Sequence, residues 1–143
     1  MENIIDKIRT ELRHSIDEKT LATSQNFFKE KIKLYGVKVP TVNKISREYF
    51  KLIDCKTKSE IVELCEILWQ SGFIEESFIA CNWSYYIHEK YEPEDFQLFE
   101  KWITNYVNNW DTCDTLCNQT ICEFIEMFPE YIVKLIDCGP SQN

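Results

Sequence analysis

The sequence predicts an all-α protein built from antiparallel helical hairpins. Apolar residues recur at intervals of three and four along almost the whole chain, which is the spacing of one face of an α-helix. Only three glycines and four prolines interrupt the 143 residues, so turn signals are too few for a many-stranded sandwich. No stretch shows the strict alternation of a half-buried strand. The apolar content of 44% and the aromatic content of 14% are typical of a folded globular chain.

Four helices are expected in the first half of the chain, each from an apolar stripe and from signals at its ends. Gly36 supplies a C-terminal cap for the second helix, and Pro40 can open the third. Thr57 or Ser59 caps the start of the fourth helix, which ends at Gly72. The expected helices cover residues 2–16, 21–34, 40–53 and 57–72.

The second half of the chain continues the same pattern. Residues 73–91 are apolar almost all round, as in a central helix. The next helix starts at Pro93 with acidic residues in its first turn, which suits the helix dipole. The predicted helices cover residues 73–91, 92–109, 110–127 and 129–136. Such hairpins cannot bury both of their faces alone, so we expect them to stack into a bundle or a HEAT-like superhelix, as one domain over residues 1–143.

Charge is distributed unevenly along the chain. The net charge is −8, which by itself disfavours a nucleic-acid partner. Residues 29–51, however, carry seven basic and two acidic side chains, a net charge of +5, whereas residues 52–143 carry five basic and seventeen acidic side chains, a net charge of −12. The basic segment is either an edge that faces phosphates or a solvated helix face, and charge alone favours the second interpretation.

The seven cysteines predict neither a disulfide framework nor a metal centre. Their number is odd, no C-x-x-C pair occurs, and the charged N-terminus contains no apolar run that would form a signal peptide or a membrane span. We therefore expect an intracellular protein, nuclear or cytoplasmic, with reduced thiols packed as small apolar groups. The spacing of Cys113, Cys117 and Cys122 matches no usual zinc site, and no cofactor is predicted.

The window "NNWDTCDTLCN", residues 108–118, combines an aromatic side chain with two carboxylates at helical spacing. Asp111 and Asp114 are three residues apart and would share a helix face beside Trp110. Both aspartates suit the positive end of a helix dipole, and Asp111 is placed to cap the helix. Spacing alone favours this capping role over a catalytic one.

Several blocks of the sequence resemble the DNA alkylation repair family of the AlkD type, which are HEAT-like DNA glycosylases. The resemblance covers roughly residues 20–131 and rests on the segments "FFKEKIKLYGVKVPTVNKI", "LWQSGFIEESFIA" and "FEKWITNYVNNWDTCDTLCN". Its strongest match is the W-D-x-x-D motif, formed here by Trp110, Asp111 and Asp114. The resemblance implies a concave face that binds duplex DNA and removes N3- or N7-alkylated purines, or, as an alternative, a non-catalytic module that binds DNA or protein.

The family likeness also implies roles for individual residues. Asp114 corresponds to the catalytic carboxylate, and Trp110 to an aromatic residue packed on the sugar of the lesion nucleotide. Phe27 falls where the family has a DNA-facing aromatic residue, often tyrosine. The cations of the basic segment would contact phosphates; they are Lys29, Lys31, Lys33, Lys38, Lys44 and Arg47.

The end of the chain departs from the family pattern. Family members continue with further helical repeats and with an arginine that contacts DNA, so the likeness predicts a C-terminally shortened solenoid. The last predicted helix carries an apolar set that a next repeat would cover: Tyr131, Ile132, Val133, Leu135 and Ile136. An exposed apolar patch of this kind marks an interface, which predicts a homodimer through residues 121–138.

Overall fold

The structure, a computed structural model, describes residues 3–27, 33–54, 56–106 and 116–131, the side chains of residues 24–27, 117 and 118 excepted. The described chain is all-α, as predicted, and its described residues contain no strand. Its long helices are α1 (Ile4–His14), α2 (Glu18–Phe27), α3 (Val39–Lys51), α4 (Lys58–Gln70), α5 (Ile74–Tyr86) and α6 (Asp95–Asn105), followed by the shorter α8 (Cys122–Met127). Short helical turns lie at His88–Lys90, Cys117–Ile121 and Pro129–Tyr131.

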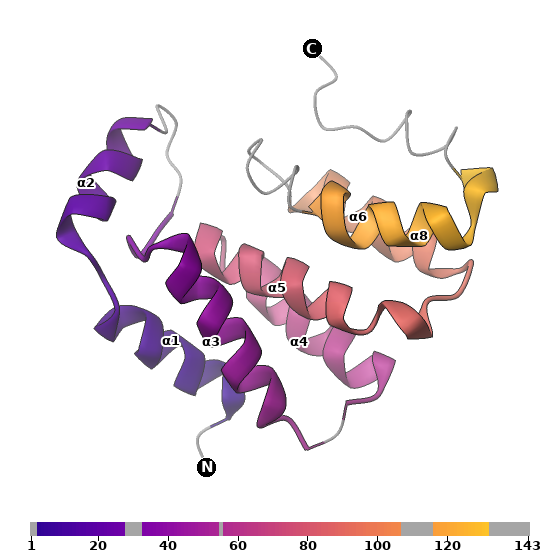
Figure 1. The fold of residues 1–143 in the computed structure, drawn as a ribbon, viewed down its shortest axis with the longest axis horizontal. Coiled ribbons are helices and arrows are strands. Elements are labelled where there is room, and N and C mark those ends of the chain that lie inside the picture. The colour runs from indigo at the N-terminus through magenta and orange to yellow at the C-terminus, as the bar shows by residue number, and fades with distance from the viewer. Residues whose placement is uncertain (1–2, 28–32, 55, 107–115, 132–143) are drawn as a thin grey trace.

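Helix α5 lies at the centre of the fold. It packs against α3, α4 and the turn Cys117–Ile121, while α1 contacts α3 and α4 (Figure 1). Ten of its residues are buried, which confirms the prediction of a central helix in this part of the sequence. The core around it contains three fully buried tryptophans, Trp69, Trp83 and Trp102. Burying side chains of this size is a large part of what stabilises such a fold.

Local signals set several helix ends where the sequence predicts them. The Thr57 hydroxyl accepts a hydrogen bond from the Glu60 N–H at 3.3 Å and so caps α4. Pro40 lies in the first turn of α3, where its missing N–H costs nothing. Gly72 follows α4 with a φ of +80°, a conformation that glycine adopts without a steric penalty.

The predicted helix over residues 21–34 is wrong in its extent. Helix α2 begins earlier, at Glu18, because the Asp17 carboxylate accepts the Thr20 N–H at 3.0 Å. Lys33 and Leu34 are not helical. The Lys33 carbonyl instead accepts a hydrogen bond from the Ile74 N–H at 2.9 Å, so the chain here runs along the start of α5. Gly36 has the predicted left-handed conformation, with a φ of +93°, but lies in this extended segment and is not a helix cap.

Two other elements are shorter than expected. The helix predicted over residues 73–91 ends at Tyr86 and is followed by the turn His88–Lys90, and α6 begins at Asp95, two residues after Pro93. Of the last predicted helix, residues 129–131 form a helical turn, and the rest lies outside the described residues. Tyr131 packs on Phe96, with ring centroids 4.9 Å apart. The predicted dimer through residues 121–138 stays a prediction.

The cysteines follow the expected packing only in part. Cys65 and Cys81 are buried thiols, and burial raises the pKa of the Cys65 thiol, as expected for inert core groups. Cys122 is exposed, which corrects the prediction of a packed thiol. It lies two residues before the buried Phe124, about 200° further round the helix, so it faces away from the core.

Candidate nucleic-acid interface

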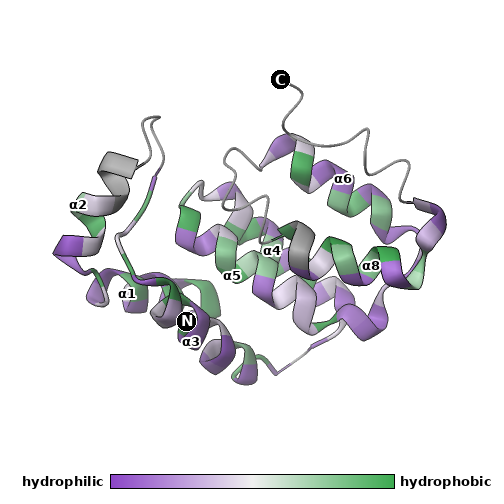
Figure 2. Cartoon of the chain, turned by 45° about the horizontal axis from the view of Figure 1, so that its top comes forward, coloured by the Kyte–Doolittle hydropathy of each residue, from purple (hydrophilic) through white to green (hydrophobic). Residues whose placement is uncertain are grey.

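Four of the predicted DNA-contacting cations lie in described parts of the chain, and all four are exposed: Lys33, Lys38, Lys44 and Arg47. Lys38 is the residue that precedes α3, and Lys44 and Arg47 lie within that helix. Residues three apart on a helix share a face, and Lys51 continues the same row. Figure 2 shows the largely hydrophilic outer side of α3. The structure thus places the described part of the basic segment along the solvent-facing side of α3 and the non-helical stretch before it.

The opposite side of α3 is held on α5 by polar contacts. The Asn82 amide of α5 donates hydrogen bonds to Asn43 Oδ1 at 3.0 Å and to Ser46 Oγ at 3.1 Å. The Trp83 indole N–H donates to the Ser46 carbonyl at 2.9 Å. Hydrogen bonds between buried groups demand one geometry. They therefore set how α3 is rotated on α5, and with it the direction in which its cations face.

The two cations within α3 have different surroundings. Lys44 forms an i,i+4 ion pair with Glu48 at 3.8 Å, and both side chains are more than half exposed, so the pair holds Lys44 only weakly. Burial raises the pKa of the Tyr86 phenol of α5, and the positive charge of Arg47 opposes this shift, so Arg47 lies on the side of α3 near α5. Both cations remain accessible to a phosphate.

Residues 33–37 are fixed to the N-terminal end of α5 by a buried carboxylate. Glu75, which is 4% exposed, accepts hydrogen bonds from the backbone N–H groups of Tyr35, Gly36 and Val37 at 2.9, 2.9 and 3.1 Å. Hydrogen bonds to a charged acceptor are stronger than those between neutral groups. The segment that begins at Lys33 is therefore held along its length.

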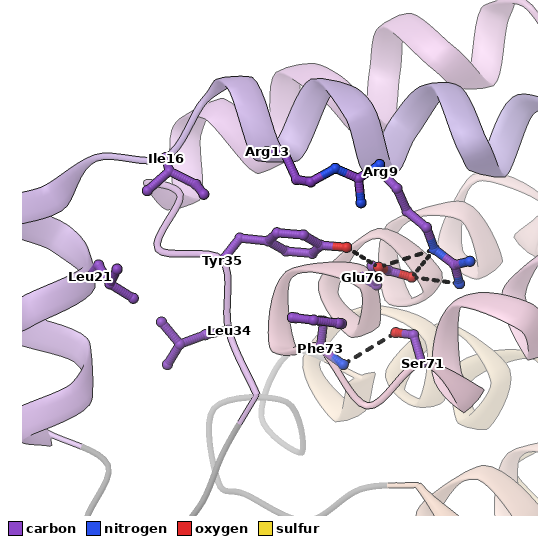
Figure 3. A pocket seen from close by; sticks show the side chains of 9 residues that line it. All are labelled: Arg9, Arg13, Ile16, Leu21, Leu34, Tyr35, Ser71, Phe73 and Glu76. Carbon is purple, nitrogen blue, oxygen red and sulfur yellow. Dashed lines mark hydrogen bonds and ion pairs between the residues drawn. The ribbon is translucent and has the colours of Figure 1, made fainter.

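An open groove lies beside this segment, between α1 and the start of α5 (Figure 3). At its floor the fully buried Glu76 accepts a hydrogen bond from the Tyr35 hydroxyl at 2.6 Å and pairs with Arg9, whose Nη2 lies 3.1 Å from Glu76 Oε1. The Tyr35 and Phe73 rings stack at 4.2 Å. The groove has a volume of about 650 Å³, and its lining residues are Arg9, Arg13, Ile16, Leu21, Leu34, Tyr35, Ser71, Phe73 and Glu76.

The charges in the groove act on one another. Burial and the hydrogen bond to Glu76 raise the pKa of Tyr35, while Arg9 and Arg13 act in the opposite direction. Lys33 adds a third cation close by, since its Nζ lies 5.6 Å from the centre of the Phe73 ring. Two arginines and one glutamate thus line the groove, and Lys33 lies over the Phe73 ring beside it. The groove therefore suits an anionic group.

The remaining predicted site residues lie outside the described residues. These are the motif residues Trp110, Asp111 and Asp114, together with Lys29 and Lys31. Phe27 is the last residue of α2, but its side chain is likewise not described. The closest described residue after the motif is Leu116, which is fully buried and leads into the π-helical turn Cys117–Ile121. The catalytic assignment of Asp114 and Trp110 therefore stays a prediction.

Sequence reasoning overlooked four residues of this region: Arg9, Arg13, Glu75 and Glu76. Two adjacent glutamates at the start of a helix that is otherwise apolar all round were a usable signal, since such a helix has no solvated face for them. Buried carboxylates need partners. The partner Tyr35 is 40 residues from Glu75 in the sequence, and Arg9 is 67 residues from Glu76. No sequence pattern pointed to those partners.

Two further classes of site have no support in the described residues. Within them, no three histidine, cysteine or acidic side chains gather as a metal ion would require. None of the helices described is long and apolar enough to cross a membrane.

The fold and the exposed cations together define an all-α protein of stacked helices with a basic helix, α3, facing solvent. The chain belongs to the DNA alkylation repair enzyme family, whose model matches residues 8–138, beyond both ends of the resemblance seen in the sequence. The family indicates a role in DNA repair, with DNA as the partner. No curated protein and no solved structure matches the chain significantly.

Proposed function

We propose that this protein is a DNA glycosylase that removes N3- or N7-alkylated purines from duplex DNA. The observation that carries the proposal is the family match, because it spans residues 8–138 and so includes the W-D-x-x-D motif of Trp110, Asp111 and Asp114. The exposed cations of α3 and of residues 33–38 support a surface that binds phosphates. In this proposal the backbone of the duplex lies along the basic segment and the lesion lies at the motif.

The proposed chemistry assigns complementary roles to two motif residues. Alkylation makes the purine cationic and a good leaving group. As the bond between C1′ and the base nitrogen breaks, its electron pair goes to the purine, which leaves as a neutral base, and positive charge develops on the deoxyribose. The Asp114 carboxylate stabilises this charge and orients the attacking water, and the Trp110 ring adds cation–π stabilisation. The water oxygen bonds to C1′ and its proton passes to the carboxylate or to solvent.

The test is a base-release assay on duplex DNA that carries N7-methylguanine. We expect the parent to release the base and Asp114→Asn to lose most of this activity, because the substitution removes the charge and keeps the shape. Asp111→Asn is the matched control in the same motif, and it should leave base release and stability almost unchanged, because asparagine caps a helix about as well as aspartate. Asp111→Ala should act chiefly on stability, by about 1 kcal/mol at the helix start. Equal rates for the parent and Asp114→Asn would refute the catalytic assignment.

The proposed DNA surface is tested separately by the salt dependence of binding. Each phosphate contact that is lost should reduce the slope of log K against log salt by about 0.9. Replacing Lys33, Lys38 and Lys44 with glutamine should therefore flatten the slope, whereas Lys101→Gln should not. Lys101 lies on α6 and pairs with Glu66 at 2.8 Å, and so it controls for the loss of one positive charge elsewhere.

The net charge of −8 favours a second candidate, a non-catalytic helical module that binds DNA or protein. Salt-dependent DNA binding without base release from any alkylated purine would support this alternative. Base release by the parent that is lost in Asp114→Asn would exclude it.

A further inference from the structure

Residues 33–38 are anchored at three consecutive backbone groups by one side chain. The Glu75 carboxylate accepts the N–H groups of residues 35, 36 and 37, which together form a concave array of donors of the kind that binds anions. Glu75 also lies in the first turn of α5, where the helix dipole favours a negative charge. The carboxylate therefore binds the donors of residues 35–37 and lies where the dipole of α5 also favours its charge.

The anchored stretch lies between two of the exposed cations. On one side, the Lys33 carbonyl accepts the Ile74 N–H at 2.9 Å, and Lys33 Nζ approaches the Ser71 carbonyl at 3.4 Å. On the other side, Lys38 follows Val37 directly and leads into α3 with extended backbone angles, φ −62° and ψ 143°. Because the backbone between them is fixed, the spacing of the Lys33 and Lys38 Cα atoms is fixed as well.

A fixed spacing matters for binding to a regular array of phosphates. Cations on a chain that must first be ordered bind more weakly, since the loss of conformational freedom opposes binding. Cations that are already held at the required spacing avoid this cost. Glu75 is buried and negatively charged, so it can act on phosphate binding only through the backbone that it holds.

We propose that Glu75 is a positioning residue for DNA binding, whose buried carboxylate holds Lys33 and Lys38 in the arrangement that contacts the DNA backbone. The inference rests on the proposed DNA surface and extends it to a residue that never touches the DNA. It predicts that a neutral side chain at position 75 changes both the affinity for DNA and the number of phosphates contacted.

The experiment measures binding of the full chain to undamaged duplex DNA over a range of salt concentrations, with Glu75→Gln as the test variant. Glutamine keeps the size of the side chain but replaces one acceptor oxygen with an NH₂ group that faces backbone donors. We expect weaker binding and a slope of log K against log salt that falls by about 0.9 for each lysine that loses its phosphate. Faster amide hydrogen exchange at residues 35–37, measured without DNA, should accompany this change.

Two controls separate positioning from a general loss of stability. Ile61→Val, a change at a fully buried residue of α4, should destabilise the fold while keeping the hydrogen bonds of Glu75 to residues 35–37, and it should leave the salt slope unchanged. In a Lys33→Gln, Lys38→Gln background, adding Glu75→Gln should cause no further loss of affinity. Glu75→Asp, which keeps the charge, should restore part of the slope.

The outcomes distinguish this inference from the proposed function. If Glu75→Gln speeds amide exchange at residues 35–37 but binds DNA with the parental affinity and slope, Glu75 is merely structural and the inference is overturned, while base release by the parent would leave the proposed function intact. A further loss of affinity in the double-lysine background would also overturn it. If the parent does not bind duplex DNA at all, both proposals fall.

Discussion

Gly36 and Gly72 provide a matched pair for testing how α2 packs on the rest of the fold. Both have a positive φ, +93° and +80°, so alanine at either position incurs the left-handed penalty of about 1–2 kcal/mol. Their surroundings differ. A Cβ at position 72 would meet only Lys33 Cδ, at 3.4 Å, whereas a Cβ at position 36 would lie 2.6 Å from Leu21 Cβ and 3.0 Å from Leu21 Cα.

The contact at Gly36 cannot be relieved by a rotamer change. The nearest atoms belong to the backbone and the Cβ of Leu21, so either α2 must move or residues 35–37 must leave Glu75. Overpacking of this kind costs about 1–3 kcal/mol. We therefore expect Gly36→Ala to lower the free energy of unfolding by about 2–5 kcal/mol, and Gly72→Ala by about 1–2 kcal/mol.

The assay is urea denaturation of the parent and both variants, followed by circular dichroism, with thermal melts as a second measure. For a chain of this length 1 kcal/mol corresponds to roughly 3 °C in Tm. Gly36→Ala should therefore melt at least about 3 °C below Gly72→Ala, with unchanged m-values. Equal losses for the two variants would show that α2 does not pack on residue 36, and would refute the reasoning.

Three further predictions concern a buried hydroxyl network and the pH dependence of stability. Thr120→Val should cost about 1–2 kcal/mol, because its hydroxyl lies 2.7 Å from Ser84 Oγ in the core, and denaturation of the double variant with Ser84→Ala should show a loss smaller than the sum of the two. The hydrogen bonds from Thr20 lower the pKa of Asp17 below 3.8, so its contribution to stability is present above that pH and should be lost as the pH falls further; an NMR titration of its carboxyl group measures the shift directly. Burial raises the pKa of Tyr91 above 10.0, so the free energy of unfolding should fall as the pH rises beyond 10, where the unfolded chain ionises first, and Tyr91→Phe should flatten this decline in alkaline denaturation series.

The sequence by itself determined the features that depend on residues close together in the chain. Helical periodicity identified the all-α class. Local backbone chemistry indicated a cap at Thr57 or Ser59 and a helix end at Gly72, and the charge count located the basic segment. The roles of Trp110 and Asp114 came from the family resemblance alone, because their spacing suits a helix start equally well. These signals are readable since each arises within a few residues of its cause.

Only the tertiary structure decided the path of residues 33–37 and the burial of the two adjacent glutamates, Glu75 and Glu76. Apolar spacing extended the second helix to Leu34, but contacts with the start of α5 hold that stretch in an extended form instead. A carboxylate enters a protein core only where donors compensate for its lost hydration, and for Glu75 and Glu76 those donors come from α1 and from residues 35–37. Partners so distant along the chain meet only after the helices have packed, so their pairing cannot be seen in any local pattern of the sequence.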